Sequence, residues 1–211
     1  MIRLNNDIEI PQIGIGTWTL RGETARQNVR LALEAGFRHI DTAQMYENEA
    51  EVGQGILDSG IPRQEIFVTT KVSTSIMRNG SEAVRNSIDG SLAKLKTDYI
   101  DLLLIHWPVK DCVRDTWQVM ENYVRQGKVK SIGVSNFNRH HLDDLLLYAE
   151  IRPVINQIEV HPFMTQVEII VPFHMRMHVS CHPSHDARWQ TQRLPCNGWC
   201  RTVSGDRHPS I

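Results

Sequence analysis

The sequence predicts an α/β fold, an incomplete (β/α)8 barrel of the TIM-barrel type that is preceded by a short N-terminal hairpin. Six apolar runs of strand length alternate with five stretches of helical periodicity, an order typical of right-handed βαβ units and a parallel sheet. Polar residues stand at the ends of successive strands. The composition changes abruptly near residue 170, after about six of the eight strands that such a barrel needs.

The elements follow one another along the chain. Ile2-Arg3-Leu4 and Ile8-Glu9-Ile10 flank Asn5-Asn6-Asp7, which indicates a small hairpin. The strands are expected near residues 13–17, 38–41, 66–71, 99–106, 130–135 and 153–158. The helices are expected near Thr24–Ala35, Asn48–Asp58, Ser81–Leu95, Val113–Gln126 and Arg139–Ala149. A doubly wound sheet also fits this order, but polar residues that end every strand favour a barrel over a single switch point.

Composition limits the classes of partner. The formal net charge of the 211-residue chain is −1, which does not suggest nucleic acid or an anionic membrane as a partner. No run of about 18 apolar residues predicts a membrane helix, and the first residues lack the apolar core of a signal peptide. We therefore expect a cytoplasmic protein with reduced cysteines, most simply a monomer.

The last part of the chain differs from the rest. Residues 1–170 contain 14 Leu and residues 171–211 contain one, and the latter have no Lys and no Glu. We therefore divide the chain into a partial barrel, 1–170, and an aberrant or disordered tail, 171–211. Three interpretations of the tail are open: an irregular segment, translation in a wrong frame, or a functional appendage. As an appendage it could bind zinc through His182, His185, Cys196 and Cys200, although their order is not the usual one.

Four polar residues are the candidate catalytic groups. Asp41, Lys71 and His106 end three consecutive strands, and Tyr46 lies in the loop just after Asp41. Singly, Asp41 could be a cap, Lys71 a solvated lysine and His106 a structural histidine. Strand ends of a parallel barrel converge on the face where active sites are built, so the four residues together favour one acid–base site.

These residue types suit the reduction of a carbonyl. A tyrosine has a pKa of about 10, and a nearby ammonium lowers that pKa by favouring the phenolate. Asp41 can keep Lys71 charged and fixed, His106 can orient the carbonyl oxygen, and Tyr46 can protonate that oxygen. Side chains cannot supply hydride, so a nicotinamide cofactor is required.

Two other kinds of chemistry were weighed. Gly14-Ile15-Gly16-Thr17-Trp18-Thr19 resembles a dinucleotide-binding fingerprint, but the third glycine is absent, so these glycines more simply let the strand approach a ligand. A barrel hydrolase could use a pair of carboxylates such as Asp41 and Glu159. Hydride transfer from NADPH separates a reductase from this hydrolase.

The motifs resemble the aldo-keto reductase superfamily over about residues 1–168. The segments that carry the resemblance are Gly14–Trp18, Gly36–Glu49, Val68–Lys71, Asp98–Pro108, Ile132–Phe137 and Asn156–Pro162. Within the superfamily the chain looks most like bacterial 2,5-diketo-D-gluconate reductases, which also reduce small aldehydes such as methylglyoxal.

The resemblance implies a (β/α)8 barrel that uses NADPH without a Rossmann fold. It makes Asp41, Tyr46, Lys71 and His106 the catalytic tetrad, with Tyr46 as the acid. It places Ser135, Asn136 and Gln157 at the nicotinamide carboxamide, Gly16, Thr17 and Asp41 beside the cofactor, and Trp18 and Trp107 in the substrate pocket. Without the family, the two tryptophans could equally be core residues, and Ser135-Asn136 could cap the next helix.

The chain departs from the family after residue 170. The family's seventh strand carries an aromatic residue that stacks on the nicotinamide, and the loop after the eighth holds the adenosine phosphate. Residues 170–211 offer no convincing equivalents. We therefore expect two unpaired sheet edges, aggregation and weak binding of NADPH. The alternative to an active reductase is an inactive copy that cannot hold the cofactor.

Overall fold

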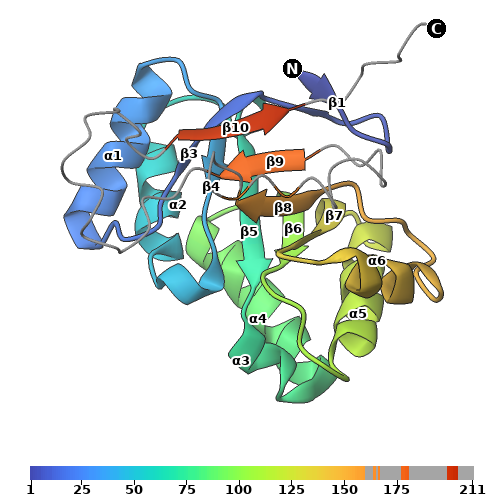
Figure 1. Ribbon diagram of the computed structural model, residues 1–211. Coiled ribbons are helices and arrows are strands. Elements are labelled where there is room, and N and C mark those ends of the chain that lie inside the picture. The colour runs from blue at the N-terminus through green and yellow to red at the C-terminus, as the bar shows by residue number, and fades with distance from the viewer. Residues whose placement is uncertain (160–163, 165, 167–176, 181–198, 204–211) are drawn as a thin grey trace, which may run out of the picture.

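The computed structural model describes residues 1–159, 164, 166, 177–180 and 199–203. Its main sheet contains six strands that run parallel to one another in sequence order, as predicted (Figure 1). They are β3 (Ile13–Gly16), β4 (His39–Asp41), β5 (Phe67–Val72), β6 (Ile100–Ile105), β7 (Val129–Ser135) and β8 (Asn156–Glu159). The short N-terminal hairpin of β1 (Ile2–Arg3) and β2 (Glu9–Ile10) is also present. The partial (β/α)8 fold is therefore confirmed.

Two further strands close the sheet, and the expectation of two unpaired edges was wrong. β9 (Met177–Ser180) pairs parallel to β8, so that Gln157 lies opposite His178. β10 (Trp199–Val203) pairs antiparallel to both β9 and β3 and completes the ring. An antiparallel strand does not continue a βα repeat. The barrel therefore closes, but not by the regular eightfold pattern.

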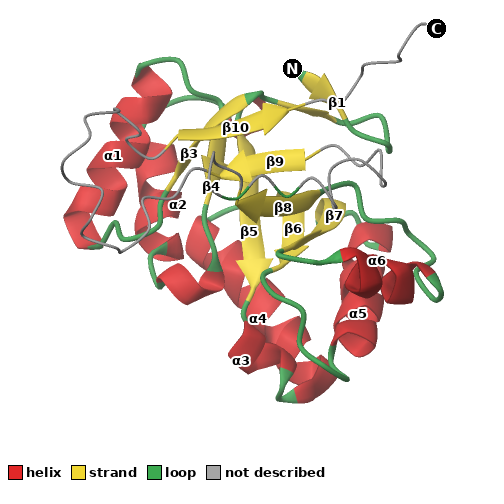
Figure 2. Cartoon of the chain, viewed as in Figure 1, coloured by secondary structure: helices red, strands yellow, loops and turns green. Residues whose placement is uncertain are grey.

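Helices lie along the outside of the parallel strands, and the five predicted ones are present (Figure 2). The expected stretch near 24–35 is α1 (Gly22–Glu34), and the others are α2 (Glu49–Asp58), α4 (Gly80–Leu95), α5 (Val113–Arg125) and α6 (Arg139–Leu146). Three short helices were not predicted: η1 (Gln44–Tyr46), η2 (Arg63–Glu65) and α3 (Thr74–Met77). Each is a single turn, too short to show a helical period in the sequence.

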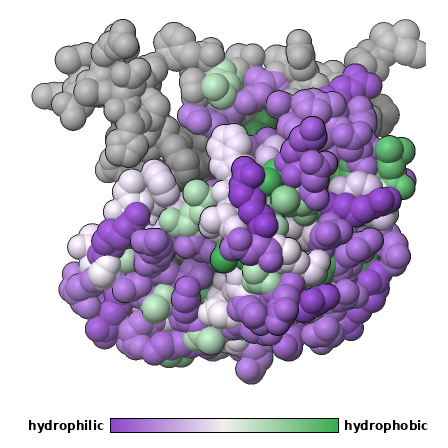
Figure 3. All heavy atoms as spheres, turned by 90° about the horizontal axis from the view of Figure 1, so that it is seen from below, coloured by the Kyte–Doolittle hydropathy of each residue, from purple (hydrophilic) through white to green (hydrophobic). Residues whose placement is uncertain are grey.

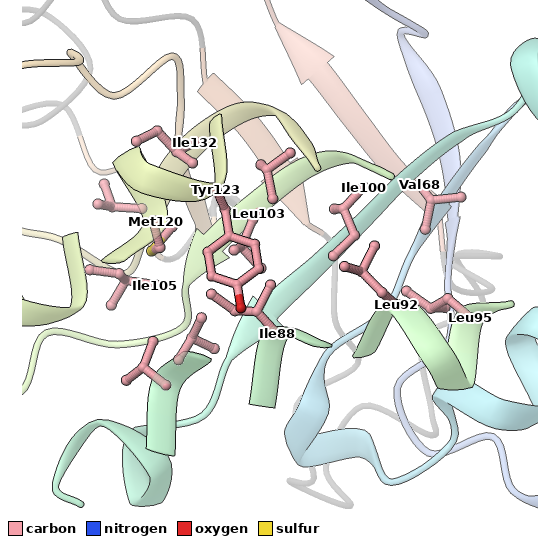
Figure 4. Packing of buried hydrophobic residues seen from close by; sticks show 14 of the residues in the cluster. Val68, Ile88, Leu92, Leu95, Ile100, Leu103, Ile105, Met120, Tyr123 and Ile132 are labelled. Atoms are coloured by element: carbon pink, nitrogen blue, oxygen red, sulfur yellow. The ribbon is translucent and has the colours of Figure 1, made fainter. Parts of the chain in front are cut away.

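The larger hydrophobic cluster lies between the outer face of the sheet and the helices (Figure 4). Strand residues such as Val68 and Leu103 meet Ile88 and Leu92 of α4 and Tyr123 of α5. The carboxyl ends of the strands and the loops that follow them are thereby held on a rigid scaffold.

The hairpin covers the amino-terminal end of the barrel. Ile2 and Ile10 pack with Leu102 and Leu104 of β6 in a second buried cluster. The side chain of Asn6 donates a 3.0 Å hydrogen bond to Ser131 Oγ of β7. The opposite end, where β5 points toward α3, is left for the functional site (Figure 1).

The described surface is mostly hydrophilic on the face seen in Figure 3, with small apolar areas among polar residues. Among the described residues, no helix has the length and apolar character needed to cross a membrane. Of the four residues of the zinc hypothesis, His182, His185 and Cys196 lie outside the described residues, and Cys200 falls in β10. The domain boundary at residue 170 stays a prediction.

Candidate active site

Three consecutive strands bring the four predicted catalytic residues together. Asp41 ends β4, Lys71 is the next-to-last residue of β5, and His106 follows the last residue of β6. Tyr46 ends η1, the turn that begins shortly after β4. All four side chains belong to buried residues. A lysine that is 1% exposed needs partners for its charge, and these partners define the site.

The ammonium group of Lys71 is the centre of the cluster. Its Nζ donates to Asp41 Oδ1 at 2.5 Å and to the backbone carbonyl of Thr42 at 2.9 Å. A third, longer contact of 3.5 Å joins Nζ to the hydroxyl oxygen of Tyr46. The arrangement supplies a cation beside a phenol, as the sequence predicted for a proton donor.

Two aromatic rings contact Tyr46. Its ring meets the ring of Trp18 edge-on, with centroids 5.0 Å apart, and the ring of His106 edge-on at 5.6 Å. Trp18 is partly exposed, so it is not a residue of the core. Trp107 follows His106 and is 50% exposed, which also excludes simple core packing. Trp18 therefore borders the tetrad at Tyr46, and Trp107 is the exposed residue next to His106 in the sequence.

The three predicted carboxamide-binding residues stand together, because Ser135 ends β7, Asn136 follows it, and Gln157 of β8 is paired in register with Ser135. Ser135 Oγ donates to the backbone carbonyl of Gln157 at 3.0 Å. Asn136 Nδ2 donates to Ser135 Oγ and to the carbonyl of His106, both at 3.0 Å. Gln157 Nε2 donates to Asp41 Oδ2 at 2.8 Å. This set of hydroxyl and amide groups fits the hydrogen-bonding needs of a nicotinamide carboxamide.

The end of β3 lies directly beside Asp41. Gly16 is paired in register with Asp41, and both the amide and the hydroxyl of Thr17 donate to the Asp41 carbonyl, at 3.0 and 3.2 Å. Gly14, two residues before Gly16, has no room for a side chain, because a Cβ there would lie 2.7 Å from His39 Nδ1. Gly14 therefore serves close packing inside the barrel.

Sequence reasoning missed a partner of the tetrad and a buried carboxylate near it in the chain. The Thr42 carbonyl is a partner of Lys71, and a backbone group leaves no signal in the sequence. Glu49 is buried, and its carboxylate accepts from Thr70 Oγ1 at 2.7 Å and from Ser91 Oγ at 3.2 Å. Burial raises the pKa of the Glu49 carboxyl, although the two hydroxyls oppose that rise. The run of three polar residues directly after Tyr46, residues 47–49, was the available signal for Glu49.

Comparison with known proteins identifies the family. A model of the aldo/keto reductase family matches residues 12–179. The chain belongs to this family. Among curated relatives, the glyoxal reductase of Bacillus subtilis is 45% identical over 169 residues, which are 80% of this chain and 60% of the relative. The chain thus spans about 60% of the length of such relatives.

Solved structures of family members support the same fold. An aldo/keto reductase from Brucella melitensis is 46% identical, with a TM-score of 0.76 over 80% of this chain and 66% of that one. An aldo-keto reductase of Bombyx mori, solved in complex with NADP, is 41% identical, with a TM-score of 0.74 over 80% of this chain and 61% of that one. The family match over residues 12–179 includes the strands that carry the tetrad.

Proposed function

We propose that this aldo/keto reductase reduces an aldehyde or ketone to the alcohol with NADPH, and that Tyr46 is the general acid. The observation that carries the proposal is the buried Lys71 ammonium, which touches both Asp41 and the hydroxyl of Tyr46. The glyoxal reductase relative and the NADP complex of a family member support it.

Each site residue has a separate role in this reduction. NADPH, when bound, supplies hydride to the carbonyl carbon. Tyr46 gives its proton to the carbonyl oxygen, and Lys71 stabilises the tyrosinate that remains. Asp41 holds Lys71 in place, and His106 orients the oxygen. Ser135, Asn136 and Gln157 would hold the carboxamide so that one face of the nicotinamide meets the substrate.

The substrate class follows from the surroundings of Tyr46. Two partly exposed indoles, Trp18 and Trp107, suit a small carbonyl compound. We propose glyoxal, methylglyoxal and keto-sugar acids such as 2,5-diketo-D-gluconate as the first compounds to test.

The geometry argues against the paired-carboxylate hydrolase. Both carboxylate oxygens of Asp41 are engaged, Oδ1 by Lys71 and Oδ2 by Gln157. A carboxylate held as an anion between two donors is a poor general acid, and it is not presented to a substrate as a nucleophile. Glu159 is the last residue of β8 and is only partly buried.

The test is oxidation of NADPH, followed at the nicotinamide absorbance, with methylglyoxal as the substrate. Tyr46→Phe should lower kcat by about 10²- to 10⁴-fold because the proton donor is lost. Tyr99→Phe is the matched control, since its hydroxyl only donates to the Arg63 carbonyl at 3.4 Å outside the tetrad. The control should keep the parent rate.

Two results would contradict the proposal. Equal rates in the parent and Tyr46→Phe would remove Tyr46 from the mechanism. A parent chain without turnover, and without quenching of its fluorescence by NADPH, would identify an inactive copy that cannot hold the cofactor.

A further inference from the structure

The turn that carries Trp18 has a strained backbone. It joins β3 to α1, and the amide of Leu20 donates to the carbonyl of Thr17 at 3.1 Å across the turn. Trp18 and Thr19 are the two central residues. Thr19 has a φ of 67°, in the left-handed region that β-branched residues avoid. Such a conformation persists only when the surrounding structure holds it.

Asn48 is the side chain that holds this turn. Asn48 is fully buried, and its Nδ2 donates to the Thr17 carbonyl at 2.8 Å and to the Leu20 carbonyl at 2.9 Å. One amide group therefore joins both ends of the turn. The Oδ1 atom accepts from the hydroxyl of Thr42 at 3.0 Å. Both amide hydrogens and the carbonyl oxygen are used.

The usual role of asparagine at this position is not the one observed. Asn48 precedes the first residue of α2, where asparagine commonly caps a helix with its side chain. Here the side chain makes no capping hydrogen bond to α2. Its amide is directed instead to the turn of Trp18 and to Thr42.

The side chain of Asn48 is linked to the tetrad in two ways, through the turn of residues 17–20 and through Thr42. Trp18, inside the clamped turn, packs edge-on against Tyr46 at 5.0 Å. Thr42, whose hydroxyl bonds Asn48, offers its carbonyl to Lys71 Nζ at 2.9 Å. Asn48 itself touches none of the four tetrad side chains in any described hydrogen bond.

We propose that Asn48 is a positioning residue, which clamps the turn of residues 17–20 so that Trp18 stays against Tyr46 and forms one wall of the substrate site. The inference deepens the proposed function, on which the role of Trp18 toward a carbonyl rests. The clamp opposes the backbone strain at Thr19. Loss of the clamp should therefore release Trp18 while the tetrad stays assembled through Lys71 and Asp41.

The test measures Trp18 without turnover. Acrylamide quenching is recorded for each protein and for the same protein with Trp18→Phe, and the difference isolates the emission of Trp18. Asn48→Ala removes two hydrogen bonds to the turn of residues 17–20. The ratio of molecules with Trp18 held against Tyr46 to molecules with Trp18 released should therefore fall by about 30-fold. The quenching of Trp18 should rise accordingly. Asn48→Asp, which is isosteric and keeps the acceptor for Thr42, should act in the same direction and serves where the alanine variant does not fold.

A rescue separates positioning from general destabilisation. Glycine adopts a positive φ without strain, so Thr19→Gly in the Asn48→Ala protein should return at least half of the change in quenching. Gln54→Ala, in the same helix α2 but bonded to Asp58 and Lys96, is the control for loss of α2 stability. It should leave Trp18 quenching unchanged.

Kinetics supply the second readout. With methylglyoxal, Asn48→Ala should raise KM by about 10-fold and change kcat by less than about threefold, because the wall moves and the proton donor does not. Quenching of Trp18 that equals the parent value in a folded Asn48 variant would overturn the clamp, as would failure of Thr19→Gly to restore it. A parent chain without turnover would contradict the proposed function. The quenching of Trp18 would still test whether Asn48 holds the turn.

Discussion

Replacing Lys71 with methionine should destabilise the protein more than any surface charge change. Lys71 is buried with Asp41, and its removal leaves the carboxylate with one described donor, Gln157 Nε2 at 2.8 Å. Breaking one side of a buried ion pair costs about 3–5 kcal/mol, because an uncompensated charge stays in the interior. At about 2–4 °C per kcal/mol for a chain of this size, the melting temperature should fall by about 6–20 °C.

The assay is urea unfolding, followed by far-UV circular dichroism, of four proteins: parent, Lys71→Met, Asp41→Asn and the double variant. The double variant removes both charges and should be about 1–3 kcal/mol more stable than Lys71→Met alone. Lys128→Met is the matched control, since Lys128 pairs with Asp89 at 3.1 Å on the exposed surface and should cost under about 1 kcal/mol. Equal stabilities for Lys71→Met and the control would refute the reasoning.

Three further predictions concern pH and packing. Burial raises the pKa of Glu49, so its stabilising contribution is complete below its unfolded pKa and is lost as pH rises through the folded pKa. Glu49→Gln should remove this loss. The prediction is contradicted if the free energy of unfolding changes equally with pH in the variant and the parent between pH 4.5 and 8. Gly53→Ala should destabilise by about 1–3 kcal/mol, because a Cβ would lie 2.5 Å from a backbone carbonyl of α4. Gly90→Ala, with open space around it, should instead stabilise by about 0.5–1 kcal/mol in thermal melts. His141 Nδ1 accepts from the amide of Asn138 at the start of α6, and burial, followed by the charge of His140, lowers the pKa of His141. The capping contribution is therefore present above the unfolded pKa and is lost as pH falls through the folded pKa, and hydrogen exchange of the α6 amides at pH 7.5 and 5 should show it in the parent but not in His141→Ala.

The parallel part of the fold could be predicted because each strand is a short apolar run followed by a helix of clear period. Ile100–Ile105 is buried at every position, as expected for a central parallel strand. The pairing of β10 could not be predicted, since it is antiparallel and bonds β3, nearly 200 residues earlier in the chain. No local pattern encodes a partner at that distance, and Trp199–Val203 shows no alternation that would mark a strand.

The tetrad could be predicted because parallel strands place their last residues on one face, so order along the chain gives proximity in space. The supporting groups could not be found in this way. The Thr42 carbonyl depends on backbone direction, and Asn48 is a preferred helix cap whose side chain bonds elsewhere. Sequence patterns report residue types at element ends, whereas these contacts depend on how a loop folds back.

The residues proposed for the chemistry and those proposed for cofactor binding lie in different parts of the chain. The tetrad comes from residues 41–106, and the groups proposed for the carboxamide come from residues 135–157. In the family the loop after the eighth strand holds the adenosine phosphate, and residues 170–211 offer no convincing equivalent of that loop. Weak binding of the adenosine end of NADPH would raise the KM for NADPH and leave kcat at saturation near the value that the tetrad sets. Comparison of NADPH with reduced nicotinamide mononucleotide, which lacks the adenosine, therefore measures what the chain gains from binding the adenosine end. Equal KM values for the two cofactors would show that the chain binds no part of the adenosine.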